Sequence, residues 1–88
     1  MNLLYFIGDF YIEVSKMLDV VNSSGEANGL QWVNGVFGKW EVYFLWFPKA
    51  KKLLCVVKNG EVEKSWEVVV KDVFEAIAVA ERILSRLK

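Results

Sequence analysis

The sequence contains no histidine and no threonine, and it has only one cysteine and one proline in 88 residues. Histidine is the commonest general acid or base and the commonest metal ligand, so its absence removes the usual means of acid–base catalysis and metal binding. Glutamine also occurs once, as Gln31, whereas lysine, glutamate and valine are abundant. This balance suggests a thermophilic source.

The chain also lacks a net charge. Its eleven basic residues balance eleven acidic ones, so no overall electric field attracts a nucleic acid or an anionic membrane. We therefore expect no membrane association. The charge total gives little information about the partner.

The single cysteine, Cys55, cannot form an intramolecular disulfide, which favours a reducing compartment and hence the cytoplasm. It falls in the middle of a predicted buried strand, whereas reactive cysteines are usually exposed in electropositive surroundings. We therefore interpret Cys55 as an inert core thiol. The sequence predicts no catalytic residue, no metal site and no cofactor, and we expect that the protein is not an enzyme.

Apolar residues make up 55% of the chain, which excludes a disordered protein, and the length predicts a single domain over residues 1–88. The first apolar stretch, from Leu3 to Ile7, is interrupted by Asp9 and Glu13 well short of the roughly 20 residues that a membrane span needs. No basic segment precedes it. We therefore expect a soluble chain without a targeting segment.

Two segments have helical periodicity. Spacings of four and three predict a first helix of about five turns, ended by Asn22 to Gly25 with Gly25 as a left-handed terminator. Its apolar stripe is Leu3, Ile7, Phe10, Val14, Met17 and Val21. Asp72 and Glu75 form a capping box that opens a final helix. The apolar stripe of that helix is Val73, Ile77, Ala80, Leu84 and Leu87.

The segment from Gly25 to Gly38 is rich in glycine and asparagine around a short apolar piece, and two interpretations stay open. The Asn34-Gly35 pair closes a tight hairpin that adds a fourth strand. Alternatively, the segment is an irregular loop that carries Trp32 and Phe37 onto the core.

Two further hairpins are predicted. Asn59-Gly60 is a strong two-residue turn signal, which places Lys58 opposite Glu61. A four-residue loop, Pro48 to Lys51, pairs Trp46 with Leu53, and it pairs Glu41 with Lys58.

The predicted fold is therefore an α+β domain of α-β-β-β-α order, in which a three- or four-stranded antiparallel meander carries two helices on one face. The strand residues expected beneath the helices are Trp40, Val42, Phe44, Trp46, Leu53, Cys55, Val57, Val62, Trp66 and Val68. This element order resembles that of the double-stranded RNA-binding domain. That family has a basic cluster at the start of its last helix, whereas Val70 to Glu75 holds one lysine and two acids, so its RNA-binding residues are not carried over.

The run from Trp40 to Phe47 is apolar on both of its faces, because alternate side chains of a strand point in opposite directions. The predicted register gathers one apolar set on the face away from the helices, namely Tyr43, Leu45, Phe47, Leu54 and Val56. Exposed clusters of roughly 300 to 400 Å² begin to mark contact sites. We expect this set to bind a second copy of the chain or another protein, unless Trp32 or the Gly25–Gly38 segment folds over it.

The alternative function is nucleic-acid binding. Lys49, Lys51 and Lys52 lie in or beside the loop after Phe47, and basic residues next to aromatic ones can hold a nucleic-acid backbone and stack bases. A solvated turn whose lysines discourage edge aggregation explains the same residues.

Overall fold

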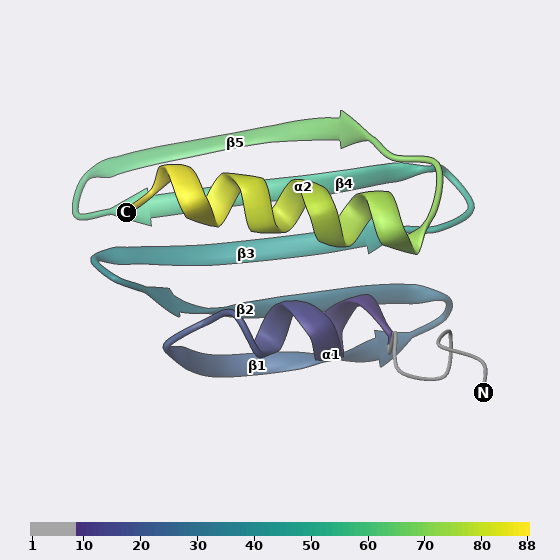
Figure 1. Cartoon of the computed structure of the whole chain (residues 1–88), viewed down its shortest axis with the longest axis horizontal. Helices are drawn as coiled ribbons and strands as arrows, with labels where there is room; N and C mark the ends of the chain where they lie inside the picture. The colour runs from purple at the N-terminus through teal and green to yellow at the C-terminus, as the bar shows by residue number, and fades with distance from the viewer. Residues whose placement is uncertain (1–8) are drawn as a thin grey trace.

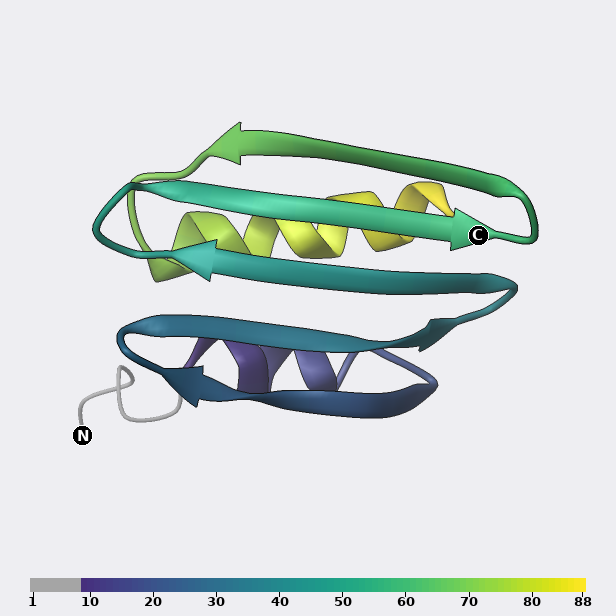
Figure 2. The same ribbon diagram turned by 180° about the vertical axis from the view of Figure 1, so that it is seen from behind.

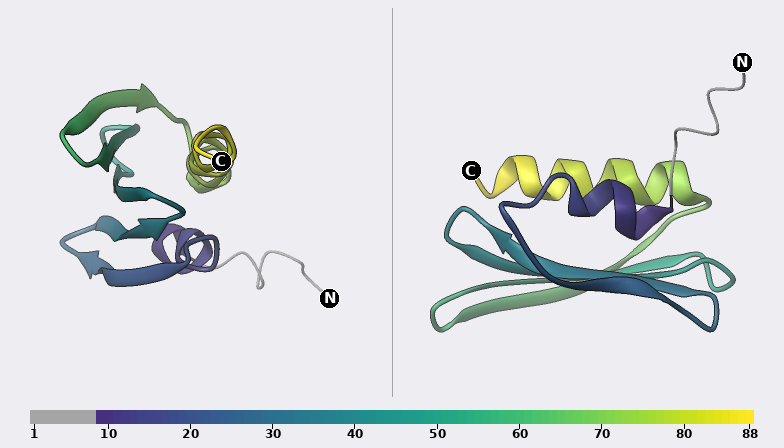
Figure 3. Two further views of the ribbon diagram at one scale, coloured as in Figure 1. Left: turned by 90° about the vertical axis from the view of Figure 1, so that its left-hand side faces the viewer. Right: turned by 90° about the horizontal axis from the view of Figure 1, so that it is seen from below.

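The structure, a computed structural model, describes residues 9–88, which form a helix, five strands and a second helix. The elements are α1 (Phe10–Ser15), β1 (Val20–Ala27), β2 (Leu30–Phe37), β3 (Trp40–Phe47), β4 (Lys52–Asn59), β5 (Val62–Val69) and α2 (Val73–Arg86). The strands form one antiparallel meander in chain order, and both helices lie on the same face of it (Figures 1 and 3). The α+β class is confirmed, whereas the predicted count of three or four strands is wrong.

The hairpin between β3 and β4 has the predicted register. Trp46 pairs with Leu53, and Glu41 pairs with Lys58. The loop between the strands holds the four residues from Pro48 to Lys51, and Lys51 adopts a φ of 55° there. Proline ends the strand because its backbone cannot donate to the sheet.

The hairpin between β4 and β5 differs from the prediction by two residues. Its turn is Gly60-Glu61, so Asn59 pairs with Val62 and Lys58 pairs with Glu63 instead of Glu61. Gly60 takes a φ of 63°, the first central position of a type II′ turn, which favours glycine. Because side chains alternate with a period of two, this shift leaves every strand residue on its predicted face.

The segment from Gly25 to Gly38 is neither of the two predicted structures. It contains the end of β1 and all of β2, joined at Asn28-Gly29, where both residues have positive φ (54° and 80°) as in a type I′ turn. The Asn34-Gly35 pair, predicted to be a turn, lies inside β2. The prediction failed because the turn that matches the twist of the strands is six residues earlier.

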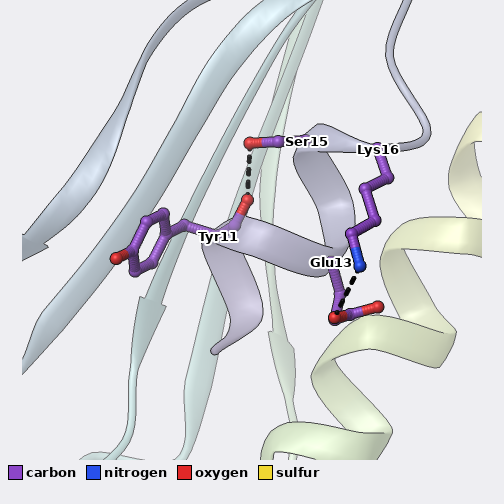
Figure 4. Close-up of polar contacts among 4 residues, drawn as sticks. All are labelled: Tyr11, Glu13, Ser15 and Lys16. Carbon is purple, nitrogen blue, oxygen red and sulfur yellow. Dashed lines mark hydrogen bonds and ion pairs between the residues drawn. The ribbon is translucent and has the colours of Figure 1, made fainter. Parts of the chain in front are cut away.

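The first helix is much shorter than predicted. Leu3 and Ile7 of its predicted stripe lie outside the described residues, and α1 ends at Ser15. Ser15 donates a hydrogen bond to the Tyr11 carbonyl oxygen, and Lys16 forms an ion pair with Glu13 at 3.3 Å (Figure 4).

The chain after α1 forms strand β1 instead of further helical turns. The β-branched Val20 and Val21 pair with Val36 and Gly35 of β2, because such residues favour a strand. Gly25, predicted to end the helix, pairs with Trp32 within the sheet.

A β-bulge between Val21 and Ser23 requires a glycine on the neighbouring strand. Gly35 lies opposite Val21, and a Cβ built at Gly35 would collide with the Val20 carbonyl oxygen. A bulge bends its strand and increases the local twist. Gly35 therefore allows β1 to approach β2 closely at this point.

Helix α2 has the predicted N-terminal cap. The Asp72 carboxylate accepts a hydrogen bond from the Glu75 backbone N–H at 2.9 Å, and the Glu75 carboxylate accepts one from the Lys71 N–H at 2.9 Å. The first bond satisfies a donor that a helix start leaves without a partner, whereas the second holds the residue before the N-cap, one position earlier than in a regular capping box.

Helix α1 is anchored to the sheet by a buried glutamine of β2. The Gln31 side chain is 5% exposed, and its Oε1 accepts a hydrogen bond from the Tyr11 backbone N–H at 3.2 Å. Asp9, the residue before the helix, makes no capping bond with its own side chain. Gln31 thus satisfies a donor of the first turn from across the interface.

The core lies between the sheet and the two helices. Phe10 and Trp46 meet with ring centroids 5.9 Å apart, and α1 also contacts α2. The buried apolar residues are Phe10, Val14, Val33, Val42, Phe44, Trp46, Leu53, Cys55, Val57, Val70, Ala76, Val79, Ala80 and Leu84.

Two residues predicted for the core are not buried. Val62 and Trp66 point to the helix side of β5, but they remain 52% and 37% exposed. Figure 1 shows the reason, because α2 lies across β4 and β3 and leaves β5 outside its footprint. Trp40 and Val68, at the same margin, are half-buried.

The five-stranded order also differs from the element order of the double-stranded RNA-binding domain. The difference comes from β1 and β2, which stand where the end of a long helix and a loop were predicted. Among residues 9–88, no helix has the length and apolar character needed to cross a bilayer.

Candidate interaction surface

The candidate site is the outer face, which we define as the sheet face turned away from both helices. Figure 2 views the molecule from this side, with the strands in front and both helices behind them. No part of residues 9–88 crosses in front of the sheet in that view. The Gly25–Gly38 segment, one predicted cover, is instead part of the sheet itself.

Strand pairing aligns the outer-face residues in rows that run across the sheet. The central row is Gly25, Trp32, Leu45, Leu54 and Glu67, one residue from each strand in order. Three adjacent apolar side chains therefore occupy the middle of the face. The rows on either side are less uniform.

On one side of the central row, Tyr43 and Val56 are paired, with Asn34 next to Tyr43 on β2. On the other side, Leu30 and Phe47 continue the register beyond Gln31 and Trp46. We call the whole set the outer apolar patch; its residues are Leu30, Trp32, Tyr43, Leu45, Phe47, Leu54 and Val56. All of them are partly buried, because neighbours on the same face shield one another.

Trp32 extends the patch towards the edge strand β1. Its indole lies over Gly25, since a Cβ at Gly25 would be 3.1 Å from the ring. The indole Nε1 donates a hydrogen bond to the Ser23 hydroxyl oxygen at 3.0 Å. The ring covers a glycine that has no side chain to pack, an arrangement that stabilises exposed strands. The indole thereby continues the apolar row of the outer face onto β1.

Charged residues of both signs surround the outer apolar patch. At one end Glu41, Lys58 and Glu63 form a row across β3, β4 and β5. Near the other end Lys52 pairs with Glu67 at 3.7 Å, with both side chains about half exposed. An apolar centre with a polar rim is the usual composition of a protein–protein interface.

The two edges of the sheet are less suited to strand addition than the face. On β1, the bulge between Val21 and Ser23 interrupts the regular backbone. On β5, Lys64 points to the helix side, and an inward charge on an edge strand opposes pairing with another strand. The outer face therefore offers the better contact surface.

The structure places Lys49, Lys51 and Lys52, the residues of the nucleic-acid alternative, at one end of the sheet, and all three are exposed. One aromatic neighbour does not join them, because Trp46 points into the core and is only 8% exposed. Phe47 lies on the outer face and Lys52 already has Glu67 as an ion-pair partner. Nucleic-acid binding here stays a prediction.

Cys55 lies on β4 beneath the helices and has no exposed surface. Burial raises the pKa of its thiol from 9.0 to about 12. The thiol therefore stays protonated at neutral pH, and a protonated thiol is a poor nucleophile.

Among the described residues, no group of three or more cysteine and carboxylate side chains is arranged to hold a metal ion. Comparison with protein-family models, with curated proteins and with solved structures finds no match to this chain. The site is therefore interpreted from its own geometry.

The sequence located five residues of the outer apolar patch, and strand alternation was the signal. It missed Leu30 and Trp32, because β2 was not recognised as a strand. Asn28-Gly29 between Ala27 and Leu30 was the available signal for it, since Asn-Gly is a favoured two-residue turn.

Proposed function

We propose that the protein is an interaction module that forms a twofold dimer by pairing the outer faces of two copies. The observation that carries this proposal is the central row of Trp32, Leu45 and Leu54, which is apolar and has no covering element within residues 9–88. Monomeric proteins rarely expose a large contiguous apolar patch.

The size of the outer face suits a stable interface. Five strands spaced by roughly 4.8 Å and eight residues rising roughly 3.3 Å each span about 20 × 26 Å. This is about 500 Å² in projection, whereas a standard interface buries about 800 Å² of accessible surface on each partner. The accessible area of a face exceeds its projection because side chains stand out from the sheet, so a standard interface would have to engage nearly the whole outer face.

The charged rim is compatible with self-association. A twofold axis brings each patch against its own copy, so the surface must be self-complementary. Because the rim carries Lys58 between Glu41 and Glu63, a rotated second copy can place opposite charges together. Sheets packed face to face in this way are about 10 Å apart, with their side chains interlocked.

Mass measurement after size exclusion tests the proposal. The protomer has a mass of 10.1 kDa, and we expect twice this value at high micromolar concentration. Leu45→Glu should weaken the dimer by at least roughly a hundredfold, because each dimer would bury two uncompensated carboxylates. The dimer should also change little with salt, whereas nucleic-acid binding through lysines would fall steeply.

Phe74→Glu is the matched control, since Phe74 is 46% exposed on α2, on the other side of the sheet. It should leave the mass unchanged. A wild-type monomer at high micromolar concentration would refute the dimer. So would an equal effect of both substitutions, provided that circular dichroism shows each variant folded.

A further inference from the structure

A second unfilled surface lies on the helix side of the sheet, between β5 and the C-terminal half of α2. Trp66 is 37% exposed, although Cys55, its partner on β4, is fully buried. The difference arises because α2 does not cover β5 (Figure 1). A cavity of about 550 Å³ opens at this place. We call it the β5–α2 groove.

The walls of the β5–α2 groove are mostly apolar. The sheet contributes Trp40, Val57, Trp66 and Val68. Val79 and Ile83 of α2 and its C-cap residue Leu87 are spaced by four residues and so lie on one side of the helix. Two indole rings and five aliphatic side chains thus line one elongated space. Its volume is within the range of roughly 300 to 1,000 Å³ that is typical of small-molecule sites.

Three cationic side chains also line the groove. Arg82 and Arg86 are one turn apart on α2, and Lys64 comes from β5. No side-chain carboxylate is among the lining residues in the described part of the chain, residues 9–88. Within residues 9–88, none of the three cationic side chains forms an ion pair or a side-chain hydrogen bond. The groove therefore combines an apolar floor with a local excess of positive charge, although the chain as a whole is neutral.

This combination restricts the chemistry of a ligand. Arginine binds carboxylates through two parallel N–H···O bonds, and such bonds are stronger than those between neutral groups. A purely apolar ligand would leave the cations without a counter-charge. A small inorganic anion would leave the indole rings exposed to water. A molecule with an aliphatic chain and an anionic head satisfies both parts of the groove.

We propose that the β5–α2 groove binds a free single-chain carboxylate amphiphile of the medium-chain fatty-acid class. The aliphatic chain lies along Trp40 and Trp66, and the carboxylate is held by Arg82 and Arg86, with Lys64 at the strand side. The inference does not depend on the dimer, because the groove is on the opposite side of the sheet from the outer apolar patch.

Calorimetric titration with decanoate tests the proposal, with decyltrimethylammonium as a probe of equal chain length and opposite charge. Both are used below their micellar concentrations. We expect one decanoate per protomer, bound at least tenfold more tightly than the cation. Indole N–H signals in NMR spectra provide a second readout that needs no variant. The signals of Trp40 and Trp66 should shift, whereas that of buried Trp46 should shift less.

The variant Arg82→Gln with Arg86→Gln should weaken decanoate binding at least tenfold. The matched control, Lys49→Gln with Lys51→Gln, removes the same charge from the distant β3–β4 loop and should leave binding unchanged. Leu45→Glu should also bind decanoate normally, since its substitution is on the outer face. All of these side chains except Leu45 are exposed, so the charge variants are expected to fold, which circular dichroism verifies.

Several results would overturn the proposal. Equal affinity for the two detergent-like probes would show that the head group is not recognised. An equal loss of decanoate affinity in the lysine and the arginine variants would show that the net charge matters and that no specific site exists. Binding to anionic vesicles without binding to monomeric decanoate would show a membrane surface instead of a groove. No binding at about 1 mM decanoate would mean a Kd well above 1 mM, and it would show that the groove has no such ligand.

Discussion

The raised pKa of Cys55 predicts a specific pH dependence of stability. The thiol has a pKa of about 12 in the folded protein and 9.0 as its reference value for the unfolded chain. A thiol is charged only when it loses its proton, so burial favours the protonated form. Above pH 9 the unfolded chain releases this proton while the folded protein keeps it. The contribution of this thiol to the free energy of unfolding is therefore fully present below pH 9 and is lost as the pH rises towards 12.

The size of the effect follows from the two values. A pH of 10.5 is about 1.5 units above the pKa of the thiol in the unfolded chain, so that thiol is mostly ionised, whereas the thiol in the folded protein is still mostly protonated. At 1.36 kcal/mol for each unit, the loss relative to pH 8 is about 2 kcal/mol. The slope through this region approaches about 1.4 kcal/mol per pH unit.

Urea unfolding of the wild type and of Cys55→Ala, measured from pH 8 to 10.5, isolates this contribution. All other ionisable side chains are the same in the two proteins, so their effect cancels in the difference between the two free energies of unfolding. The cavity left by the substitution costs the same at every pH. We expect the advantage of the wild type to fall by about 2 kcal/mol across the range.

A constant difference between the two proteins would refute the reasoning. It would mean that the thiol titrates at its ordinary pKa, and hence that water reaches β4 beneath the helices. A thiol reagent gives an independent measurement. At pH 8 the folded protein should react at the rate of unfolding, and urea should accelerate the reaction to that of an ordinary thiol.

Three substitutions test the sheet and the attachment of α1. Gly35→Ala should destabilise the protein by about 1–3 kcal/mol in urea unfolding, because its Cβ meets the Val20 backbone. Gly25→Ala should cost less, since its Cβ meets the Trp32 side chain, which can move; the reverse order would contradict the bulge geometry. Gln31→Met keeps most of the volume but leaves the Tyr11 N–H without its acceptor, so it should cost about 1–2 kcal/mol. Hydrogen exchange should rise at Tyr11, and unchanged exchange there would argue against this hydrogen bond.

The parts of the fold that were predicted correctly depend on two signals in the same place. For the β3–β4 hairpin, side-chain alternation and the pairing of Glu41 with Lys58 agreed on one register, and Pro48 marked the end of β3. For the β4–β5 hairpin the turn was displaced from Asn59-Gly60 to Gly60-Glu61, because both pairs place glycine where a positive φ is allowed. Alternation still assigned the faces correctly.

The parts that could not be predicted have weak local patterns. Strand β1 is an exposed edge with little alternation between apolar and polar residues, so its sequence lacks the usual strand signal. Val21 follows Met17 by four residues and so continues the helical spacing, which is why the sequence predicts a further helical turn there. This segment forms a strand because pairing with β2 gives hydrogen-bond partners to the backbone N–H and C=O groups of both strands.

The two candidate sites differ in how much of each could be predicted from the sequence. The outer apolar patch follows from alternation in β3 and β4, so most of it was predicted. The β5–α2 groove could not be predicted, because the alternation in β5 places Trp66 among the core residues. The predicted face of Trp66 was correct. Its exposed fraction, however, depends on where α2 crosses the sheet, and this is set by the packing of α2 against β3 and β4. No periodicity along the chain reports that placement.

Both surfaces have the same physical origin, which is a sheet wider than the helices that cover it. Strands β3 and β4 are apolar on both faces, and within residues 9–88 the single helical layer covers only one of these faces. Strand β5 extends beyond the footprint of α2, so one margin of the covered face is open as well. A single layer of two helices, one of them only six residues long, cannot close both gaps. A second copy of the sheet would cover the first gap, whereas the second gap, a groove of about 550 Å³ lined by three cationic side chains, has the size of a small-molecule site. The proposed dimer and the proposed ligand site thus rest on one imbalance between strands and helices, and disrupting either surface should leave the other intact.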